Sequence, residues 1–468
     1  MADTIDDQLE KFIAENFEAT ITKPLSDFIR IPNLSRLYDK EYLTNGLLEK
    51  ACQFVIDWSK TQGIEGLTIE LLKEEGRTPA ILAIVDQKDA PTVLMYGHID
   101  KQPHMTEKWR KGLHPTEPVI ENGRLYGRGG ADDGYAFFAC IYIVKALQKF
   151  ACQKHRFVFF FECDEESGSA DLMFYLDKVA QKIGEPKLII CLDSGTVDYD
   201  HLSLTTTLRG AVGFSLTVTT HTEGVHSGMG SGILPDTFRI ARQVIDKFED
   251  PVTGRLPDGL YANIPKDKYI QACDLIGELG KLDYKFPFLE GVDPISKDPL
   301  VQYINRNLGP TCTLTGFSGV PTPDKAGNVL HPSTTYVFSV RLPPTLKHEI
   351  AVEVIENFFK NLKVPFNADL KVAIKGAGTG LNVPAYSPQL QAAIHEAAMK
   401  FYKKVPLYVG EGGSIPFLCD LQKKYKDAEM LIAGVLGPES NAHGPNEFIH
   451  LKYTENLIQS FVRIFRRL

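Results

Sequence analysis

The chain has 468 residues, a hydrophobic content of 43% and a formal net charge of −8. This length is enough for one large or two medium domains, each with its own hydrophobic core. The negative charge and the lack of a long basic run argue against nucleic-acid binding, which depends on neutralising phosphates. The sequence has no stretch apolar enough to span a bilayer and no signal peptide, so we expect no membrane association.

The eight cysteines are scattered along the chain and form no Cys-X-X-Cys pair. Several lie in apolar runs, which is typical of buried free thiols in a reducing compartment. We therefore expect a cytoplasmic protein without a cysteine-ligated zinc site.

The first two hundred residues alternate helix-like and strand-like segments. Apolar residues at helical spacing predict a helix over about 43–58, and the long apolar run 135–150 predicts a buried helix. Short β-rich runs predict four strands, at 80–85, 92–97, 156–162 and 187–193. Apolar strands that alternate with helices indicate an α/β sheet that is covered on both faces.

The pattern changes near residue 207. The expected segments are then an alternating strand (214–220), a helix (236–248), a strand (334–342) and a further helix (345–362). A Pro- and Gly-rich stretch separates the first two from the last two. This order predicts a separate α+β unit.

The α/β character returns after the Gly-rich stretch 375–384. A helix (387–402), a strand (430–435) and a final helix (451–467) are expected there. We therefore predict a discontinuous α/β domain, formed by 1–206 and 382–468, with an inserted α+β domain over 207–381.

Acidic and histidine residues follow the ends of four predicted strands. The groups are His98-Ile99-Asp100, Asp164-Glu165-Glu166, Asp193-Ser194-Gly195 and Asn441-Ala442-His443. A Gly-rich turn before the 135–150 helix adds Asp132. Because ligands of α/β sheets bind at the carboxyl ends of the strands, we expect these side chains to converge. Mixed imidazole and carboxylate ligands suit Zn²⁺, with Mn²⁺ and Co²⁺ as alternatives, and a cation would relieve the repulsion among the carboxylates.

Each of these residues also has an ordinary structural interpretation. A single histidine such as His98 or His443 is more often structural than metal-binding. Asp132 and Asp193 would equally serve as helix caps, and the Glu165-Glu166 pair as a solvated turn. The argument for a metal site is their joint placement after apolar strands.

Eight motifs that span nearly the whole chain resemble the dinuclear zinc aminoacylase/carnosinase-type metallopeptidases, and within them the cytosolic non-specific dipeptidases. The motifs are GHID (97–100), YGRGGADD (126–133), CDEESGS (163–169), LDSG (192–195), GVHSG (224–228), VRLPP (340–344), EGGSIP (411–416) and SNAHGPNE (440–447). The resemblance implies an α/β, mixed-sheet zinc-peptidase catalytic domain with an inserted α+β lid or dimerisation domain. It also implies a homodimer formed through that inserted domain.

The resemblance assigns five metal ligands. His98 and Asp193 resemble the terminal ligands of one zinc. Glu166 and His443 resemble the terminal ligands of the other, and Asp132 resembles the carboxylate that bridges the two ions.

The resemblance also assigns catalytic roles. Glu165 resembles the general base, and Asp100 resembles the partner that orients His98. His226 resembles the hydrogen-bond donor to the oxyanion, which in dimeric relatives comes from the neighbouring subunit.

Three further residues resemble the substrate-binding group of the family. Arg341 resembles the side chain that grips the terminal carboxylate of the substrate, for which a guanidinium fork is well suited. Ser414 and the backbone at Gly413 would bind the same carboxylate. An exposed strand-end arginine and a plain Gly-rich helix entry are the ordinary interpretations of these positions.

The sequence departs from the family pattern after Asp133, where Gly134-Tyr135 replaces the usual Lys-Gly. We expect this change to affect local packing or substrate fit and not metal binding. The sequence thus predicts a metal-dependent dipeptidase that uses a metal-bridged water to hydrolyse small peptides. Two alternatives stay open, namely an aminoacylase or amidase acting on N-acyl amino acids, and a non-catalytic binding protein on the same fold.

Overall fold

The computed structural model describes residues 4–282 and 286–468. The chain forms two compact units, and the first comprises Met1–Thr205, Val383–Val409 and Asp420–Leu468. The second comprises Thr206–Asn382 together with Gly410–Cys419. The predicted division places this last segment, which contains Gly413 and Ser414, in the first domain.

A mixed β-sheet forms the centre of the first unit. Six of its nine strands, in spatial order, are β1 (Leu67–Leu72), β2 (Ala80–Val85), β6 (Arg156–Glu162), β3 (Thr92–His98), β7 (Pro186–Cys191) and β17 (Glu429–Ile432). The strands from β6 to β17 run parallel, whereas β1 and β2 add to the edge antiparallel. This arrangement confirms the predicted α/β class with a mixed sheet.

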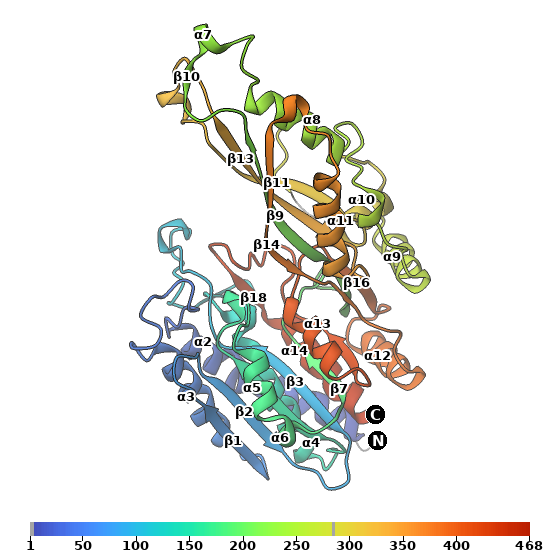
Figure 1. The fold of residues 1–468 in the computed structure, drawn as a ribbon. Coiled ribbons are helices and arrows are strands. Elements are labelled where there is room, and N and C mark those ends of the chain that lie inside the picture. The colour runs from blue at the N-terminus through green and yellow to red at the C-terminus, as the bar shows by residue number, and fades with distance from the viewer. Residues whose placement is uncertain (1–3, 283–285) are drawn as a thin grey trace. The chain divides into compact units, whose positions relative to one another are not determined.

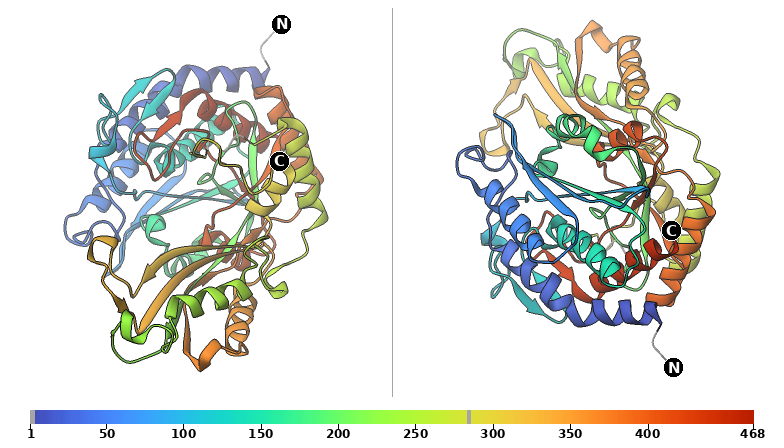
Figure 2. Two further views of the ribbon diagram at one scale, coloured as in Figure 1. Left: turned by 90° about the horizontal axis from the view of Figure 1, so that it is seen from above. Right: turned by 90° about the horizontal axis from the view of Figure 1, so that it is seen from below.

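Helices cover both faces of this sheet (Figures 1 and 2). One face carries α1 (Ile5–Phe17), α3 (Leu47–Lys60), α4 (Tyr135–Lys149) and α14 (Leu451–Arg467). The other face carries α5 (Leu172–Lys178) and α6 (Ala180–Ile183). Helix α4 is buried nearly all round, which explains why its sequence is apolar throughout instead of amphipathic.

The second unit is an α+β unit built on a four-stranded antiparallel sheet. Its strands, in spatial order, are β11 (Thr311–Ser318), β13 (Ser333–Leu342), β9 (Gly210–Thr219) and β14 (Asp369–Gly378). Alternate residues of β9 and β13 are buried against α8 (Thr237–Phe248) and α11 (His348–Lys360), which lie beside these strands in Figure 1. The alternating sequence pattern of these strands reflects this half-buried sheet.

The remaining elements of the second unit lie outside this sheet. They include the two-stranded pair β10 (Val225–His226) and β12 (Val329–Leu330), and the helices α7 (Ser227–Gly230), α9 (Lys266–Leu279) and α10 (Pro299–Asn307). Helix α13 (Pro416–Lys424) begins in its last segment.

Several predicted boundaries differ from the observed ones, among them the start of β9 at Gly210 and the end of β17 at Ile432. Helix α3 begins only at Leu47, after Gly46 with a φ of 69°, so Leu43 precedes the helix. Strand β7 ends at Cys191, so Asp193 lies in the loop that follows the strand. Every helix of the described residues is too short or too polar to cross a membrane.

Candidate metal centre

The candidate ligands lie beyond the same end of the parallel strands of the first unit. His98 is the last residue of β3, and Glu165 and Glu166 form a short 3-10 turn after β6. Asp193 follows β7, and Asp132 lies in the Gly-rich turn directly before α4. His443 belongs to the loop between β17 and β18 (Phe448–His450), where its φ of 62° is uncommon for a residue with a side chain.

The carboxylate of Asp132 lies between two groups of side chains. Its Oδ1 is 3.3 Å from Nε2 of His98, and the same nitrogen is 3.9 Å from Oδ2 of Asp193. Its Oδ2 is 3.0 Å from Nε2 of His443, which is 3.2 Å from Oε2 of Glu166. One carboxylate therefore has an oxygen in each of two adjacent imidazole–carboxylate clusters.

Asp100 fixes both His98 and the turn that carries the two glutamates. Nδ1 of His98 lies 3.1 Å from the backbone oxygen of Asp100 and 3.4 Å from its Oδ1. The Asp100 carboxylate also accepts hydrogen bonds from the backbone amides of Glu165 (3.2 Å) and Glu166 (3.1 Å). These contacts leave Nε2 of His98 directed at Asp132.

Two sets of potential ligand atoms converge closely enough to hold an ion. Oxygen or nitrogen atoms of His98, Asp132 and Glu166 lie within 4.8 Å of one another, and so do those of His98, Glu165 and Asp193. Glu165 therefore lies in the same cluster as the candidate ligands. In addition, Oε1 of Glu166 is buried and has no hydrogen-bond partner among the described residues.

Nearby positive charge stabilises the ionised carboxylates of the cluster, and nearby negative charge opposes their ionisation. Burial and the charge of Asp193 raise the pKa of Glu165, and burial and the charge of Asp132 raise that of Glu166. Burial also opposes ionisation of Asp132, but hydrogen bonds from His443 and His98 outweigh it and lower its pKa. The hydrogen bonds to Asp132 and Glu166 in turn raise the pKa of His443 to about 11. A divalent cation would also supply positive charge there.

A buried ion pair that the sequence analysis did not single out holds the turn with Asp132. Nη1 of Arg128 donates to Oε2 of Glu447 (2.7 Å), and neither side chain is more than 1% exposed. The Glu447 carboxylate also accepts the backbone amides of Gly129 (3.2 Å), Ala131 (3.1 Å) and Asp132 (3.2 Å). Nη2 of Arg128 donates to the backbone oxygen next to His443, that of Gly444. One ion pair thus joins the segments that carry Asp132 and His443.

A second contact missing from the sequence analysis is an amide on Glu166. Nε2 of Gln102 donates to Oε2 of Glu166 at 2.6 Å, and both side chains are buried. Gln102 lies in the loop after β3, two residues beyond Asp100. Its closeness in sequence to His98, a candidate ligand, is the sequence signal for this role. It leaves Oε1 of Glu166 as the unpartnered oxygen.

The Gly134-Tyr135 pair is buried and closely packed. A β-carbon at Gly134 would lie 2.4 Å from the Phe28 ring and 2.5 Å from the Gly129 oxygen, so this turn has no room for a side chain. The hydroxyl of the buried Tyr135 donates to the backbone oxygen of Leu192, next to Asp193. Tyr135 thereby supports the loop that carries a candidate ligand.

The other candidate site residues belong to the second unit. Nη1 of Arg341, near the end of β13, donates to Oγ of Ser414 (3.0 Å), and that hydroxyl donates to the backbone oxygen of Arg209. Gly413 accepts the backbone amide of Arg209, so Arg341, Ser414 and Gly413 form one group. His226 is exposed on β10, where its Nδ1 accepts the backbone amide of Gly228 (3.1 Å).

Within this unit, His226 and Arg341 lie far apart. His226 pairs with Val329, which precedes the start of β13 at Ser333, whereas Arg341 lies near the other end of that strand. At ~3.3 Å per residue, the strand separates these two ends by roughly 26 Å. Figure 1 shows β10 and α7 at one end of the strands of this unit. A single dipeptide is too short to contact both side chains of one chain.

Comparisons with known proteins identify relatives of the chain. The chain is similar to the cysteinylglycine-S-conjugate dipeptidase of Corynebacterium striatum, with 29% identity over 371 residues that cover 77% of each chain. Its fold matches that of the di-peptidase Dug1p of Saccharomyces cerevisiae with a TM-score of 0.73, at 21% identity over 98% of this chain and 97% of that one. It matches human carnosine dipeptidase 1 with a TM-score of 0.72, at 17% identity over 99% of both chains.

A family model covers most of the chain. Residues 94–467 match the model of peptidase family M20/M25/M40, and this range includes every candidate ligand from His98 to His443. The chain therefore belongs to peptidase family M20/M25/M40.

Proposed function

We propose that the chain is a metal-dependent dipeptidase whose active centre holds two divalent cations, both Zn²⁺ in the native enzyme. The observation that carries this proposal is the position of Asp132, whose two carboxylate oxygens face two separate clusters. A single metal site has no need of a carboxylate between two sets of imidazole and carboxylate groups, whereas a dinuclear site does.

The residues fit such a pair of ions. His98 and Asp193 would bind one ion, Glu166 and His443 the other, and Asp132 both. The unpartnered, buried Oε1 of Glu166 supports this assignment, because buried carboxylate oxygens normally have a partner. The nitrogen and oxygen donors suit Zn²⁺, and Mn²⁺ and Co²⁺ are the alternatives.

Bound divalent cations would supply Lewis acidity, which lowers the pKa of a water molecule and polarises the scissile carbonyl. Glu165 would accept the proton of the attacking water and pass it to the leaving amine. Its place beside His98 and Asp193 puts its carboxylate within reach of that reaction. Asp100 would keep His98 oriented through the contacts to Nδ1.

Arg341, Ser414 and the Gly413 backbone would bind the terminal carboxylate of the peptide. A guanidinium that donates to a neutral hydroxyl keeps its charge available for an anion. His226 would donate a hydrogen bond to the oxygen on which negative charge builds. The relatives named as dipeptidases support a short peptide as the substrate.

We also infer a homodimer through the second unit. Because the length of β13 separates His226 from Arg341, His226 would serve the active centre of the neighbouring subunit. The apolar side chains of Met229 and Ile233 near His226 are 77% and 82% exposed, which is typical of a surface that a partner covers. All eight cysteines are free thiols, which supports a location in the cytoplasm.

The test is a substrate panel with the full chain loaded with Zn²⁺, Mn²⁺ or Co²⁺. It compares unblocked dipeptides with N-acetyl amino acids that share the same C-terminal residue. We expect hydrolysis of the dipeptides and two metal equivalents per subunit. Hydrolysis of the N-acetyl compounds alone would make the chain an aminoacylase. No hydrolysis and no bound metal would make it a non-catalytic relative.

A further inference from the structure

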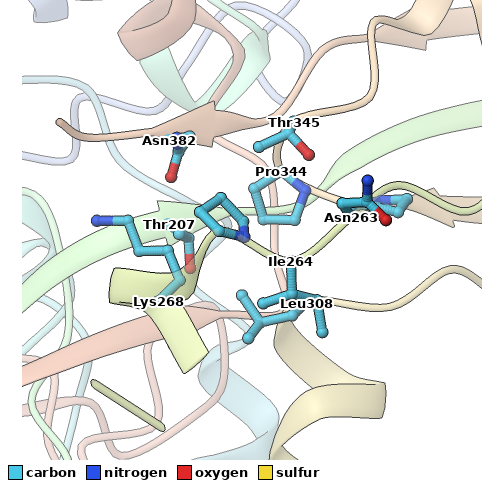
Figure 3. A pocket seen from close by; sticks show the side chains of 10 residues that line it. Thr207, Asn263, Ile264, Lys268, Leu308, Pro344, Thr345 and Asn382 are labelled. Atoms are coloured by element: carbon cyan, nitrogen blue, oxygen red, sulfur yellow. The ribbon is translucent and has the colours of Figure 1, made fainter. Parts of the chain in front are cut away.

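The pocket of the second unit that is shown in Figure 3 is too small for a substrate group. Its walls are formed by polar and apolar side chains, among them Asn263, Lys268 and Leu308. The free volume of about 10 Å³ holds about one water molecule. Contacts with a clearer bearing on catalysis lie in the first unit, next to the candidate metal centre.

Residues 33–37 of the first unit contact the loop that follows strand β3. Asn33 is completely buried, and its Nδ2 donates to the backbone oxygen of Ile99 at 2.7 Å. The backbone amide of Ser35 donates to the backbone oxygen of Lys101 at 2.9 Å. These two bonds hold the segment to both neighbours of the aspartate that would orient a metal ligand.

The same segment contacts the 3-10 turn that carries the two glutamates of the candidate metal centre. Oγ of Ser35 and Oγ of Ser167, the last residue of the turn, form a hydrogen bond of 2.5 Å, and Oγ of Ser167 accepts the backbone amide of Leu37 at 3.0 Å. Nε of Arg36 forms an ion pair of 2.9 Å with Oδ1 of Asp164, which directly precedes the turn and has a completely buried side chain. The segment therefore contacts the chain on both sides of the two glutamates.

Asp164 organises the backbone of the turn. Its backbone oxygen accepts the amides of Ser167 (3.2 Å) and Ser169 (2.8 Å), and its Oδ2 accepts the amide of Ala170 (2.9 Å). Among the described residues, only Arg36 forms an ion pair with the Asp164 carboxylate. Because burial of a charge is costly unless it is paired and hydrogen-bonded, loss of the Arg36 guanidinium would destabilise this conformation of the turn.

The turn gives two neighbouring glutamates different surroundings. Atoms of Glu165 lie close to His98 and Asp193, whereas Oε2 of Glu166 lies 3.2 Å from Nε2 of His443. The direction of both carboxylates depends on the conformation of this one short turn. A reacting group that is displaced by about 1 Å can slow a reaction by about 10²-fold. Contacts that fix the turn can therefore affect the rate without contacting the substrate.

We propose that Arg36 and Ser35 are positioning residues, which hold the turn so that Glu165 can act as the general base. The inference rests on the proposed dipeptidase function. Asp100 holds the turn through two of its backbone amides. Arg36 and Ser35 hold the side chains that lie before and after the glutamates. Two separate parts of the chain thus fix the position of the base.

The test measures kcat, KM and metal content of the Zn²⁺-loaded full chain, with the unblocked dipeptide Ala-Ala as substrate. The variants are Arg36→Gln, Arg36→Lys and a matched control, Arg77→Gln. Arg77 pairs with Asp171 at 2.5 Å, and its side chain is 35% exposed, close to the 26% of Arg36. We expect Arg36→Gln to lower kcat by about 10–100-fold, with KM and metal content near those of the parent. Arg36→Lys should restore most of kcat, and Arg77→Gln should keep the kcat of the parent.

A double-mutant cycle of Ser35→Ala and Ser167→Ala keeps the inference testable if Arg36→Gln does not fold. Each single change should lower kcat. Because both changes remove the same hydrogen bond, the double variant should lower kcat by less than the product of the two single effects. Equal kcat values for the parent and all three serine variants would contradict the role of Ser35.

Urea denaturation of the same variants shows whether a loss of activity follows a loss of stability. An unchanged kcat in Arg36→Gln, or an equal loss of kcat in Arg77→Gln, would overturn the inference and leave the dipeptidase function intact. Loss of metal from Arg36→Gln would also overturn it, because the segment would then support the ligand Glu166 and not the base. Failure of the loaded parent chain to cleave any dipeptide would instead refute the proposed function.

Discussion

Removal of the Glu447 carboxylate should destabilise the first unit and weaken metal binding together. Glu447→Ala leaves the buried guanidinium of Arg128 without its partner and three backbone amides without their acceptor. Loss of one partner of a buried ion pair typically costs about 3–5 kcal/mol, which is a large part of the ~5–15 kcal/mol stability of a domain. Glu447→Gln keeps an acceptor oxygen and should cost less.

Two matched variants identify the cause of the destabilisation. Glu439→Ala removes a glutamate from the same loop, but this glutamate is 51% exposed and pairs with Arg124 at 3.5 Å, so its loss should cost at most about 1 kcal/mol. The double variant Arg128→Met/Glu447→Ala should cost clearly less than the sum of the single changes, because it removes both buried charges.

The assay is urea denaturation of the metal-free chain, followed by tryptophan fluorescence. Both tryptophans, Trp58 and Trp109, belong to the first unit and report on it directly. Competition with a chromogenic chelator should in addition show a 10–100-fold weaker affinity for the cation, roughly as for other groups that orient metal ligands. A free energy of unfolding for Glu447→Ala equal to that for Glu439→Ala would show that the buried ion pair does not stabilise the first unit.

Four further changes test separate parts of the account. Glu165→Gln should lower kcat by about 10²–10⁴-fold while two metal ions stay bound, and loss of metal would show instead that Glu165 is a ligand. His226→Ala should lower kcat by about 10²–10³-fold with unchanged metal content. If His226 acts across a dimer, mixing His226→Ala subunits with Glu165→Gln subunits should restore activity. No recovery despite proven subunit exchange would show that each subunit has a self-contained active centre. Arg341→Met should raise KM for a dipeptide far more than for the corresponding dipeptide amide, and an equal rise for both would contradict the carboxylate contact. Burial lowers the pKa of His155 in the folded chain to about 4, whereas an exposed histidine in the unfolded chain has a pKa of about 6.5. As the pH falls from about 6.5 towards 4, the unfolded chain therefore binds a proton at His155 before the folded chain does. The free energy of unfolding should therefore decrease in this window by up to about 1.4 kcal/mol per pH unit. In His155→Phe, the denaturation midpoint should decrease less steeply with falling pH. The same pH dependence in parent and variant would show that His155 does not cause the decrease.

The sequence predicts the elements whose hydrophobic pattern is strong. Strand β2, helix α4 and helix α14 lie within one residue of the predicted ranges, because each packs a continuous or regularly spaced set of apolar residues. Strands β11 and β14 escaped prediction, because both are edge strands of the second unit and most of their residues are at least partly exposed. Neither strand therefore has a fully buried face to mark it.

The candidate site shows the same contrast. His98, Asp132, Glu166, Asp193 and His443 come together as expected, because the topology of a parallel sheet gathers its strand ends. Their role as ligands stays a prediction. The contacts of Glu447 with the Asp132 turn and of Gln102 with Glu166 carry no periodic signal, since they depend on loops that meet only in the folded chain.

Anomalous X-ray diffraction from crystals of the full chain loaded with Zn²⁺ tests the dinuclear centre most directly. We expect two peaks roughly 3.5–4 Å apart, one bounded by His98 and Asp193, the other by Glu166 and His443, with Asp132 contacting both. A single peak that leaves one oxygen of Asp132 without metal, or zinc bound elsewhere in the chain, would contradict this expectation.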